Sequence, residues 1–352
     1  MTEAGMRERT SGARETELRR LLYLTERVGN DPLLTQASTG NSSAKLDGAL
    51  WIKASGKWMA DAIRDDIFIR LDLEGVRECM RRSDDPAGRY RGASLETAMH
   101  AALPHRMVLH VHCVDTIAWA VRLDGSFHLE RLLDGLPWRW IPYVASGLPL
   151  SREIDRALSA HPDTDVFVLG NHGLVLGGDD AESIEGLLAE VRRRVSIHPR
   201  RAPAADLAAL WEISKNSPWG LPADDDVHAL GTDADSQAIL RGGVLYPCQA
   251  IFSDSGTPEL FRAIACPERG DQWQHRYFNR PFLIIEGRGV IVSRTIAPAE
   301  LAMISGLARV VQRLSAAAPV RYLTAAEIGG IARETAHRYR ELSSARQALG
   351  VR

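Results

Sequence analysis

Two histidines stand one residue apart in the apolar run Met107-Val108-Leu109-His110-Val111-His112. On an extended strand, side chains at positions i and i+2 leave the same face, so the Cβ atoms of His110 and His112 are expected about 7 Å apart. Two imidazoles at that separation can converge on one metal ion. Burying both rings among aliphatic neighbours without partners would be unfavourable, and a shared metal ion satisfies both at once.

His172 is the candidate for a third ligand. It follows the apolar run Val166–Leu169 within the turn Gly170-Asn171-His172-Gly173. The flanking glycines let backbone approach closely and leave the imidazole exposed to a cleft, although the same residues also suit an ordinary tight turn. Three neutral imidazoles with one coordination position left open are typical of a catalytic metal site.

Glu96, shortly before the strand with the paired histidines, is the candidate general acid/base. A partly desolvated carboxylate near a divalent cation can exchange a proton with a substrate. Ser94 has the chemistry of a helix N-cap, so Glu96 could instead stabilise the first helical turn through the helix dipole. His100 lies four residues later on the same helix face, where it could orient Glu96 or replace it as a ligand.

Turns rich in small polar residues supply candidate anion-binding groups. Gly40-Asn41-Ser42 and Ser55-Gly56-Lys57 offer backbone N–H groups, hydroxyls and a lysine, which can hold a phosphate or carboxylate. Ser94 adds a donor at a helix N-terminus. Each of these segments also fits plain turn chemistry when taken alone, and Lys53 could face the same cleft or solvent.

The elements that must position these residues follow from the hydrophobic periodicity and turn signals. Alternating or apolar runs predict strands at 49–54, 66–72, 107–112, 138–144, 243–252, 281–285 and 289–292, and two strands around the turn at 171–173 within 166–176. Amphipathic patterns predict helices at 15–28, 73–80, 94–103, 151–160, 181–195, 205–213, 299–316 and 325–344.

The same reading predicts a disordered N-terminus over 1–13, a first domain over 14–200, a Pro- and Asp-rich connecting segment over 201–233, and a C-terminal α/β lobe over 234–352. That lobe could be a degenerate partial repeat of the first domain. Leu283–Ile285 and Gly289–Val292 echo the two strands around His172, with Arg288 in place of the histidine.

Bulk composition restricts the class of protein. The chain has 352 residues and a formal net charge of −2, with acidic and basic residues interspersed, which argues against a nucleic-acid surface or a basic membrane patch. The N-terminus lacks the apolar core of a signal peptide, and no apolar stretch is long enough to span a bilayer. The four cysteines form no Cys-x-x-Cys pair, so we expect reduced thiols and a cytoplasmic protein: Cys79, Cys113, Cys248 and Cys266.

The ordered set of motifs resembles the class II aldolase/adducin family. The pattern of that family runs Gly-Asn-x-Ser, a (Ser/Thr)-Gly turn, a Ser-x-Glu helix start, His-x-His and His-Gly-(Leu/Val). The matching segments, which span roughly residues 35–195, are Gly40-Asn41-Ser42-Ser43, Ser55-Gly56, Ser94-Leu95-Glu96, His110-Val111-His112 and His172-Gly173-Leu174. The longer framing is similar to the aldolase portion of bifunctional rhamnulose-phosphate aldolase/alcohol dehydrogenases, as in Leu50–Gly56, His161-Pro162-Asp163 and Pro281–Val292.

The resemblance implies a three-layer αβα fold with a central, mostly antiparallel sheet, and a homotetramer with active sites between subunits. It implies a zinc-like divalent ion (Zn²⁺, or Mn²⁺ or Co²⁺) on His110, His112 and His172, with Glu96 as acid/base. A ketose phosphate would bind near the small residues of the motifs: Gly40, Asn41, Ser55, Gly56 and Ser94. The implied activity is metal-dependent cleavage of a ketose or ketose 1-phosphate through a metal-stabilised enediolate.

Two departures and two alternatives accompany this reading. Leu95 replaces a second serine of the aldolases, and Lys53 or Lys57 could compensate for it. The aldolases also recruit a tyrosine acid, for which Tyr143 and Tyr277 are only candidates. Because the family also contains decarboxylases and epimerases on the same metal triad, and adducins that use the domain as a non-catalytic scaffold, fold and ligands alone do not fix the reaction.

Overall fold

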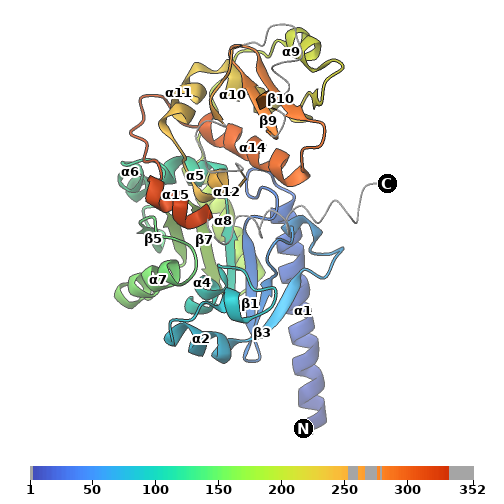
Figure 1. Cartoon of the computed structure of the whole chain (residues 1–352). Helices are drawn as coiled ribbons and strands as arrows, with labels where there is room; N and C mark the ends of the chain where they lie inside the picture. The colour runs from blue at the N-terminus through green and yellow to red at the C-terminus, as the bar shows by residue number, and fades with distance from the viewer. Residues whose placement is uncertain (1–2, 253–260, 266–275, 278–279, 333–352) are drawn as a thin grey trace. The chain divides into compact units, whose positions relative to one another are not determined.

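A computed structural model describes residues 3–252, 261–265, 276–277 and 280–332 (Figure 1). The chain divides into two compact units. The first comprises Met1–Thr116 and Leu129–Val195, and the second comprises Ile117–His128 and Ser196–Arg352. Each unit has a sheet of its own among the described residues.

The first unit is organised around a sheet to which seven strands contribute in the described part of the chain, in the order β3-β2-β1-β4-β7-β6-β5. Neighbouring strands are antiparallel except for β5 and β6, which are parallel. The predicted mostly antiparallel sheet is therefore confirmed. The strands are β1 (Asn41–Leu46), β2 (Ala49–Lys53), β3 (Phe68–Asp72), β4 (Met107–Val111), β5 (Trp138–Ile141), β6 (Val166–Leu169) and β7 (Gly173–Gly178).

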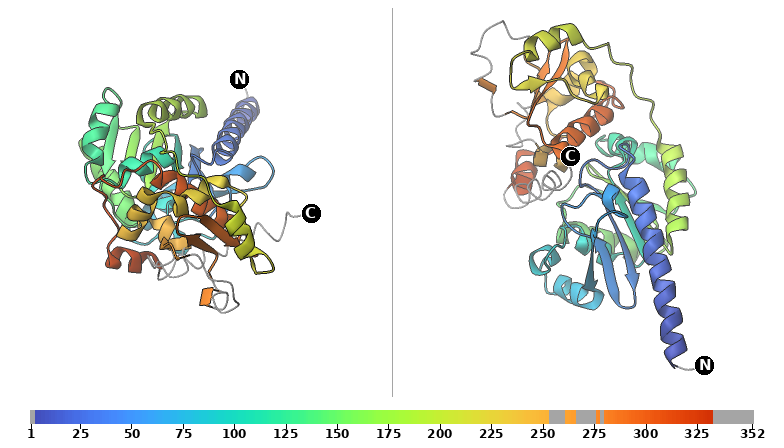
Figure 2. Two further views of the ribbon diagram at one scale, coloured as in Figure 1. Left: turned by 90° about the horizontal axis from the view of Figure 1, so that it is seen from above. Right: turned by 90° about the vertical axis from the view of Figure 1, so that its right-hand side faces the viewer.

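Helices cover both faces of this sheet, which gives the predicted three-layer αβα arrangement (Figure 2). Helices α1 and α8 lie against each other and contact β1, β4 and β7, whereas α2, α4 and α7 pack together on the opposite face. The helical elements between residues 3 and 195 are α1 (Glu3–Gly29), η1 (Met59–Asp61), α2 (Leu73–Arg81), α3 (Pro86–Arg89), α4 (Thr97–Ala102), α5 (Val114–Ala120), α6 (Gly125–Leu132), α7 (Leu148–Ala160) and α8 (Ala181–Val195).

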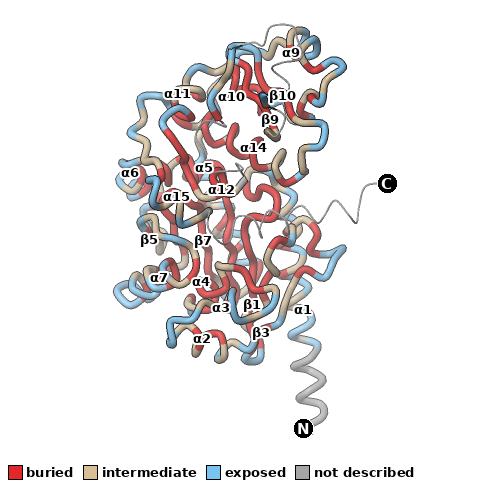
Figure 3. The backbone as a smooth tube through the Cα atoms, viewed as in Figure 1, coloured by how far each residue is buried: buried red, intermediate tan, exposed pale blue. Residues whose placement is uncertain are grey.

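Burial explains why the central strands are apolar without alternation. Every residue of β4 and β6 is buried, since helices cover both of their faces, whereas the edge strand β3 is largely exposed or half-buried (Figure 3). Continuous apolar runs are expected for strands covered on both sides. A histidine inside such a strand is consequently placed in the interior of the unit.

Two local expectations for the first unit are wrong. Helix α1 begins at Glu3, within the segment predicted to be disordered; the Glu, Arg and Ala content of that segment favours helix. Ser94 is not the N-cap of α4, because that position belongs to Glu96, whose side chain makes no capping hydrogen bond. The Ser94 N–H instead donates to Thr97 Oγ1 at 3.1 Å, which forms a turn ahead of the helix.

The second unit contains the predicted smaller α/β lobe. Its described sheet has the order β8-β10-β9 and is antiparallel. Leu210, Trp219, Leu283, Ile285 and Ile291 form its apolar core. Its elements are α9 (Leu207–Ser214), β8 (Trp219–Gly220), η2 (Asp225–His228), α10 (Ala229–Thr232), α11 (Ala234–Gly242), α12 (Pro247–Phe252), β9 (Phe282–Ile285), β10 (Gly289–Ser293), α14 (Pro298–Val311) and α15 (Ala325–Ala332).

The second unit differs from expectation in several segments. The strand predicted over 243–252 is not formed: residues 247–252 are the helix α12, which starts at a proline and is preceded by a hydrogen bond of 2.7 Å from the Leu245 N–H to the Gln249 side chain. β9 and β10 form an antiparallel hairpin followed by a helix, as β6 and β7 do. The predicted connecting segment 201–233 holds α9, β8 and η2, with Trp219 of β8 fully buried.

Residues 117–128, predicted to belong to the first domain, group with the second unit. The Leu123 N–H donates to the Pro319 carbonyl at 2.7 Å, and the Arg321 N–H donates to the Val121 carbonyl at 2.8 Å. Helix 325–344 is described only to Ala332, and Cys266 also lies outside the described residues. Cys79, Cys113 and Cys248 are buried, and none of them forms a disulfide within the described residues. Within the described ranges, no helix has both the length and the apolar character needed to cross a membrane.

Candidate metal centre

Strand pairing in the first unit brings the predicted ligands together. The register of β1 and β4 places Asn41 opposite His110, and β4 pairs with β7 directly after the turn that carries His172. Glu96 reaches the same point from the start of α4. One ligand atom from each of Glu96, His110, His112 and His172 lies within 4.8 Å of every other in this group.

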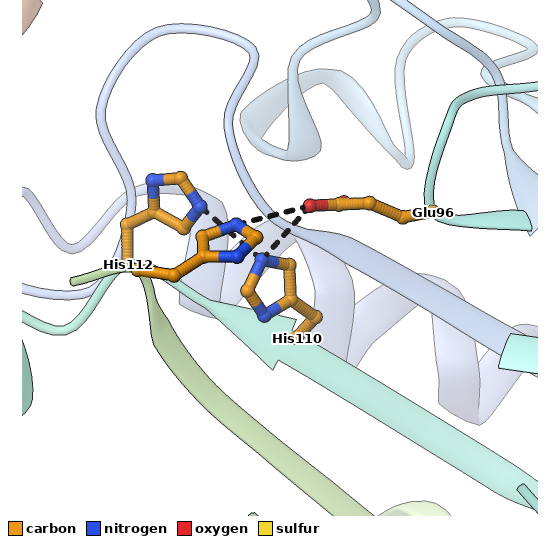
Figure 4. A group of neighbouring side chains, drawn as sticks. Glu96, His110 and His112 are labelled. Atoms are coloured by element: carbon orange, nitrogen blue, oxygen red, sulfur yellow. Dashed lines mark hydrogen bonds and ion pairs between the residues drawn. The ribbon is translucent and has the colours of Figure 1, made fainter. Parts of the chain in front are cut away.

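Three of the distances between these atoms match the edges of a metal tetrahedron. His110 Nε2 lies 3.2 Å from His112 Nε2 and 3.1 Å from Glu96 Oε1 (Figure 4). His172 Nε2 lies 3.4 Å from the same carboxylate oxygen. A tetrahedron with bonds of about 2.0–2.1 Å to nitrogen and oxygen has edges of about 3.3 Å. The donor set, three imidazoles and one carboxylate oxygen, therefore fits one small divalent cation.

The hydrogen bonds around the imidazoles orient them for this role. His110 Nδ1 donates to the Leu174 carbonyl at 3.0 Å, which leaves the lone pair of Nε2 directed at the centre of the group. The backbone carbonyl of His112 accepts a hydrogen bond of 3.3 Å from Gln36 Nε2. The three rings pack edge to face, with centroids 4.9–5.2 Å apart, so each nitrogen approaches the centre from a different direction.

The second oxygen of Glu96 is held by the protein. Asn41 Nδ2 donates to Glu96 Oε2 at 2.5 Å, and the same group lies 3.5 Å from Ser94 Oγ. Asn41 Oδ1 is buried and has no hydrogen-bond partner among the described residues. Asn41 and Ser94 thus form a polar margin beside the carboxylate, with one acceptor left to bind a further donor.

Electrostatics favour an ionised carboxylate beside neutral rings. Burial works to raise the pKa of Glu96, but the positive charge that His110 carries when it is protonated, and the hydrogen bonds from His110 and His172, hold that pKa well below its ordinary value. Burial lowers the pKa of His112 well below its usual range, and it lowers the pKa of His172 as well. Neutral imidazoles and an anionic carboxylate are the protonation states that a metal ion requires.

Two glycines leave space around the ligand residues that a side chain would fill. A Cβ on Gly173 would lie 2.6 Å from the Val111 carbonyl oxygen, 3.3 Å from His110 Cε1 and 3.4 Å from His112 Cδ2. Gly40 has a φ of +74°, and its Cβ would meet the His110 carbonyl oxygen at 2.8 Å. Close backbone packing around the site therefore explains why glycine occupies these positions of the Gly-Asn and His-Gly motifs.

The remaining predicted residues fall into two groups. Ser55 lies in the neighbouring loop, where its N–H donates to the Gly92 carbonyl at 2.9 Å, two residues before Ser94; the following residue, Gly56, is buried with a φ of +73°. His100 is not part of the metal-ligand group: its Nδ1 lies 2.7 Å from Ser43 Oγ, and its backbone N–H donates to the Glu96 carbonyl at 3.1 Å. Of the candidate tyrosine acids, Tyr143 has its backbone nitrogen near Gly170 in the first unit, and Tyr277 belongs to the second unit.

Sequence reasoning missed Gln36 and assigned no role to Ser43, the serine of the Gly-Asn-x-Ser motif; both residues support the site. Gln36 fixes the backbone of His112 and also donates to the Pro32 carbonyl at 3.0 Å. Ser43 follows Asn41 by two residues on β1, so the strand alternation could have indicated that it shares the face of Asn41. Nothing in the sequence around Gln36 signals its contact with a residue 76 positions away.

Comparison with known proteins identifies the domain that carries this site. The family model of the class II aldolase and adducin N-terminal domain matches residues 19–198, about half of the chain. A Bacillus subtilis protein described as the uncharacterized oxidoreductase YuxG is 26% identical over 185 residues, which cover 46% of this chain and 27% of that protein. The chain thus spans about a quarter of the length of that curated relative.

Solved structures of lower similarity include the N-terminal class II aldolase domain of a conserved protein from Thermoplasma acidophilum. It has 21% identity and a TM-score of 0.43, covering 50% of this chain and 90% of that one. L-fuculose-1-phosphate aldolase from Thermus thermophilus has 20% identity and a TM-score of 0.37, covering 50% of this chain and 92% of that one.

Proposed function

Because this chain belongs to the class II aldolase/adducin family, we propose that it is a metal-dependent lyase that cleaves a ketose or a ketose 1-phosphate between C3 and C4. The observation that carries the proposal is the spacing of the Nε2 atoms of His110, His112 and His172 and the Glu96 carboxylate around one point. His110, His112 and His172 would hold the cation. Zn²⁺ is the proposed ion, with Mn²⁺ and Co²⁺ as the other candidates for this donor set.

When bound, a divalent cation supplies positive charge where negative charge develops on the substrate as the carbon–carbon bond breaks. The protein's own contribution begins with Glu96. Its Oε1 occupies the fourth corner of the donor group, and a substrate oxygen that takes this corner leaves the carboxylate beside the substrate. Asn41 keeps the carboxyl group from moving away, because it holds Oε2.

Glu96 then transfers the proton at carbon. In the condensation direction, the ionised carboxylate removes a proton from the carbon next to the ketose carbonyl, and the electron pair is delocalised into an enediolate. The enediolate carbon attacks the aldehyde carbonyl carbon and forms the new carbon–carbon bond, while the C=O π pair moves to the aldehyde oxygen, which takes a proton from solvent. In the cleavage direction the same steps run backwards. The C4 hydroxyl loses its proton to solvent as its oxygen forms the aldehyde C=O, the C3–C4 electron pair passes to the enediolate, the aldehyde leaves, and the Glu96 carboxyl returns its proton to carbon.

Gly40, Asn41, Ser55, Gly56 and Ser94 are proposed to bind the polar end of the substrate. The hydrogen bonds between Asn41 and Ser94, and between the Ser55 N–H and the Gly92 carbonyl, support this assignment because they join the three segments that carry these residues. A homotetramer, a cytoplasmic location and the narrower likeness to rhamnulose-phosphate aldolases remain predictions from the sequence.

The test is a screen of the full-length protein, loaded with zinc, manganese or cobalt, against ketose 1-phosphates and free hydroxy-keto acids. Release of an aldehyde that stops in the Glu96→Gln variant supports the lyase proposal. Release of carbon dioxide would indicate a decarboxylase, and conversion of a substrate to its epimer without cleavage would indicate an epimerase. A purified protein that contains no metal and is indifferent to chelators would favour an adducin-like scaffold.

A further inference from the structure

Lys53, the last residue of β2, is a fully buried cation that lies between two loops of the site. Its side chain is among the largest fully buried ones, with 1% of the residue exposed. Its Nζ donates to the Ser38 carbonyl at 3.0 Å and to the Lys57 carbonyl at 2.8 Å. An ammonium group has three N–H donors, so these two bonds leave one donor without a partner in the part of the chain that the structure describes.

The two carbonyls belong to the loops that carry the proposed substrate-binding residues. Ser38 precedes Gly40 and Asn41 by a few residues, and Lys57 directly follows Ser55-Gly56. Leu50 and Ile52 of β2 pack in the apolar cluster against α2 and α4, so the next residue of the strand points to the opposite face. Lys53 therefore lies behind the two loops and joins them through their backbones.

Among the residues that the structure describes, no carboxylate is hydrogen-bonded to Lys53 to balance its charge. Desolvation by burial lowers its pKa to about 8, and the charge of Glu96 works in the opposite direction. The ammonium is still largely protonated at neutral pH. With a divalent cation on three neutral imidazoles, Lys53 and Glu96 together leave this region with an excess of positive charge. The polar groups at its margin, on Asn41, Ser55 and Ser94, are uncharged.

We propose, building on the lyase function above, that Lys53 is a positioning residue that clamps the loops of Gly40-Asn41 and Ser55-Gly56 and makes them a site for an oxyanion group of the substrate. Leu95, which follows Ser94, offers no hydroxyl beside the polar groups of Asn41 and Ser94. Lys53 thus favours anion binding through its buried positive charge and through the spacing of the two loops, and it does not contact the anion directly. The substrate class is a sugar that bears a phosphate or a carboxylate.

The test measures anion binding by titration calorimetry on the full-length protein, both zinc-loaded and metal-free, with inorganic phosphate and with acetate as probes. The comparison is between the wild type, Lys53→Met and Lys215→Met. The Lys215 side chain is exposed at the end of α9 and belongs to none of the proposed binding segments, so Lys215→Met is the matched control for the loss of one positive charge. Preference for phosphate or for acetate distinguishes the two oxyanion classes.

We expect Lys53→Met to bind the preferred anion about tenfold more weakly or worse in both metal states, and Lys215→Met to stay within about threefold of wild type. With an active substrate, KM should rise with little change in kcat, a split that general loss of structure would not produce. Equal anion affinity in wild type and Lys53→Met, or no anion binding by wild type, overturns the proposal. Anion binding is independent of turnover, so a failure of the lyase function is a separate result.

A spectroscopic readout keeps the test decisive if Lys53→Met and the second variant Lys53→Gln both fail to fold. The chain contains only four lysines, Lys45, Lys53, Lys57 and Lys215, so selective ¹³Cε labelling gives four signals. Signals missing from Lys45→Arg, Lys57→Met and Lys215→Met assign Lys53 by elimination. Phosphate or acetate should shift the Lys53 signal and leave Lys215 unchanged; an unperturbed Lys53 signal at saturating anion refutes the proposal.

Discussion

Replacing Gly173 with alanine tests the geometry of the metal centre with a single methyl group. Gly173 begins β7, next to His172, and a Cβ there would point between the rings of His110 and His112. Its φ does not lie in the left-handed region, so alanine is not excluded by backbone strain. The effect of this substitution therefore comes from contacts alone.

The magnitude follows from the distances. The new methyl would lie 2.6 Å from the Val111 carbonyl oxygen, and relief to 3.0 Å requires a shift of about 0.4 Å, twice the roughly 0.2 Å tolerance of metal–ligand distances. Changes to the groups that orient metal ligands typically lower metal affinity 10- to 100-fold, or about 1.4–2.8 kcal/mol, and we expect a loss of this size for Gly173→Ala. Overpacking should also lower the free energy of unfolding by about 1–3 kcal/mol.

The assay is competition for zinc with a chromophoric chelator, together with thermal unfolding of the metal-free protein. Gly186→Ala is the matched control, because Gly186 is an exposed position of α8 with no atom within 4 Å of the added Cβ. That variant should keep wild-type zinc affinity and gain about 0.5–1 kcal/mol from helix propensity. Wild-type zinc affinity in Gly173→Ala would show that β7 does not set the ligand positions.

Three further predictions address the carboxylate, its partner and the pH dependence. Glu96→Gln should retain bound metal, measured by elemental analysis, and lose retro-aldol turnover by orders of magnitude; an unchanged rate removes Glu96 from the mechanism. Asn41→Ala removes the donor to Glu96 Oε2, so kcat should fall about 10- to 100-fold. The control is Ser42→Ala, which should leave kcat unchanged because the Ser42 hydroxyl bonds Thr25 on the other face of β1. Burial lowers the pKa of His100 from 6.5 to about 3, so its contribution to stability is complete above pH 6.5 and is lost as the pH falls, because only the unfolded chain takes up the proton. In chemical denaturation of the metal-free protein, His100 should lower the free energy of unfolding by about 2 kcal/mol as the pH falls from 6.5 to about 5. The His100→Gln variant should lack this part of the pH dependence.

The sequence predicts the elements of the first unit well where local rules decide them. The apolar run of β4 is long enough to identify a covered strand, and helix α8 lies where its periodicity places it. Local signals failed at Ser94, because a serine ahead of a helix favours capping, whereas here its hydroxyl meets Asn41 and its N–H meets Thr97. They also failed at Val244–Phe252, where short apolar runs fit either a strand or a buried helix.

Predicting the site depended on a different kind of information. The i, i+2 rule places His110 and His112 on one face, but it says nothing of His172, which joins them only because β7 pairs with β4. The order of motifs shared with the family linked His172 to the paired histidines, and no physical rule applied to the sequence did so. The support from Gln36 and the burial of Lys53 depend on loop packing over long sequence separations, which no local pattern encodes.

The arrangement of the imidazoles also explains why a cation belongs there. His110 uses its Nδ1 proton on the Leu174 carbonyl, so its Nε2 carries a lone pair, and the Nε2 of His112 faces it at 3.2 Å. Without an ion, a neutral His112 that carries its proton on Nε2 can donate it to His110 Nε2. With His112 in the other tautomer, both Nε2 lone pairs are available, and a divalent ion meets the two rings and the Glu96 carboxylate together. The fold thus brings three buried imidazoles and a carboxylate to one point, and this preorganised donor set favours metal binding.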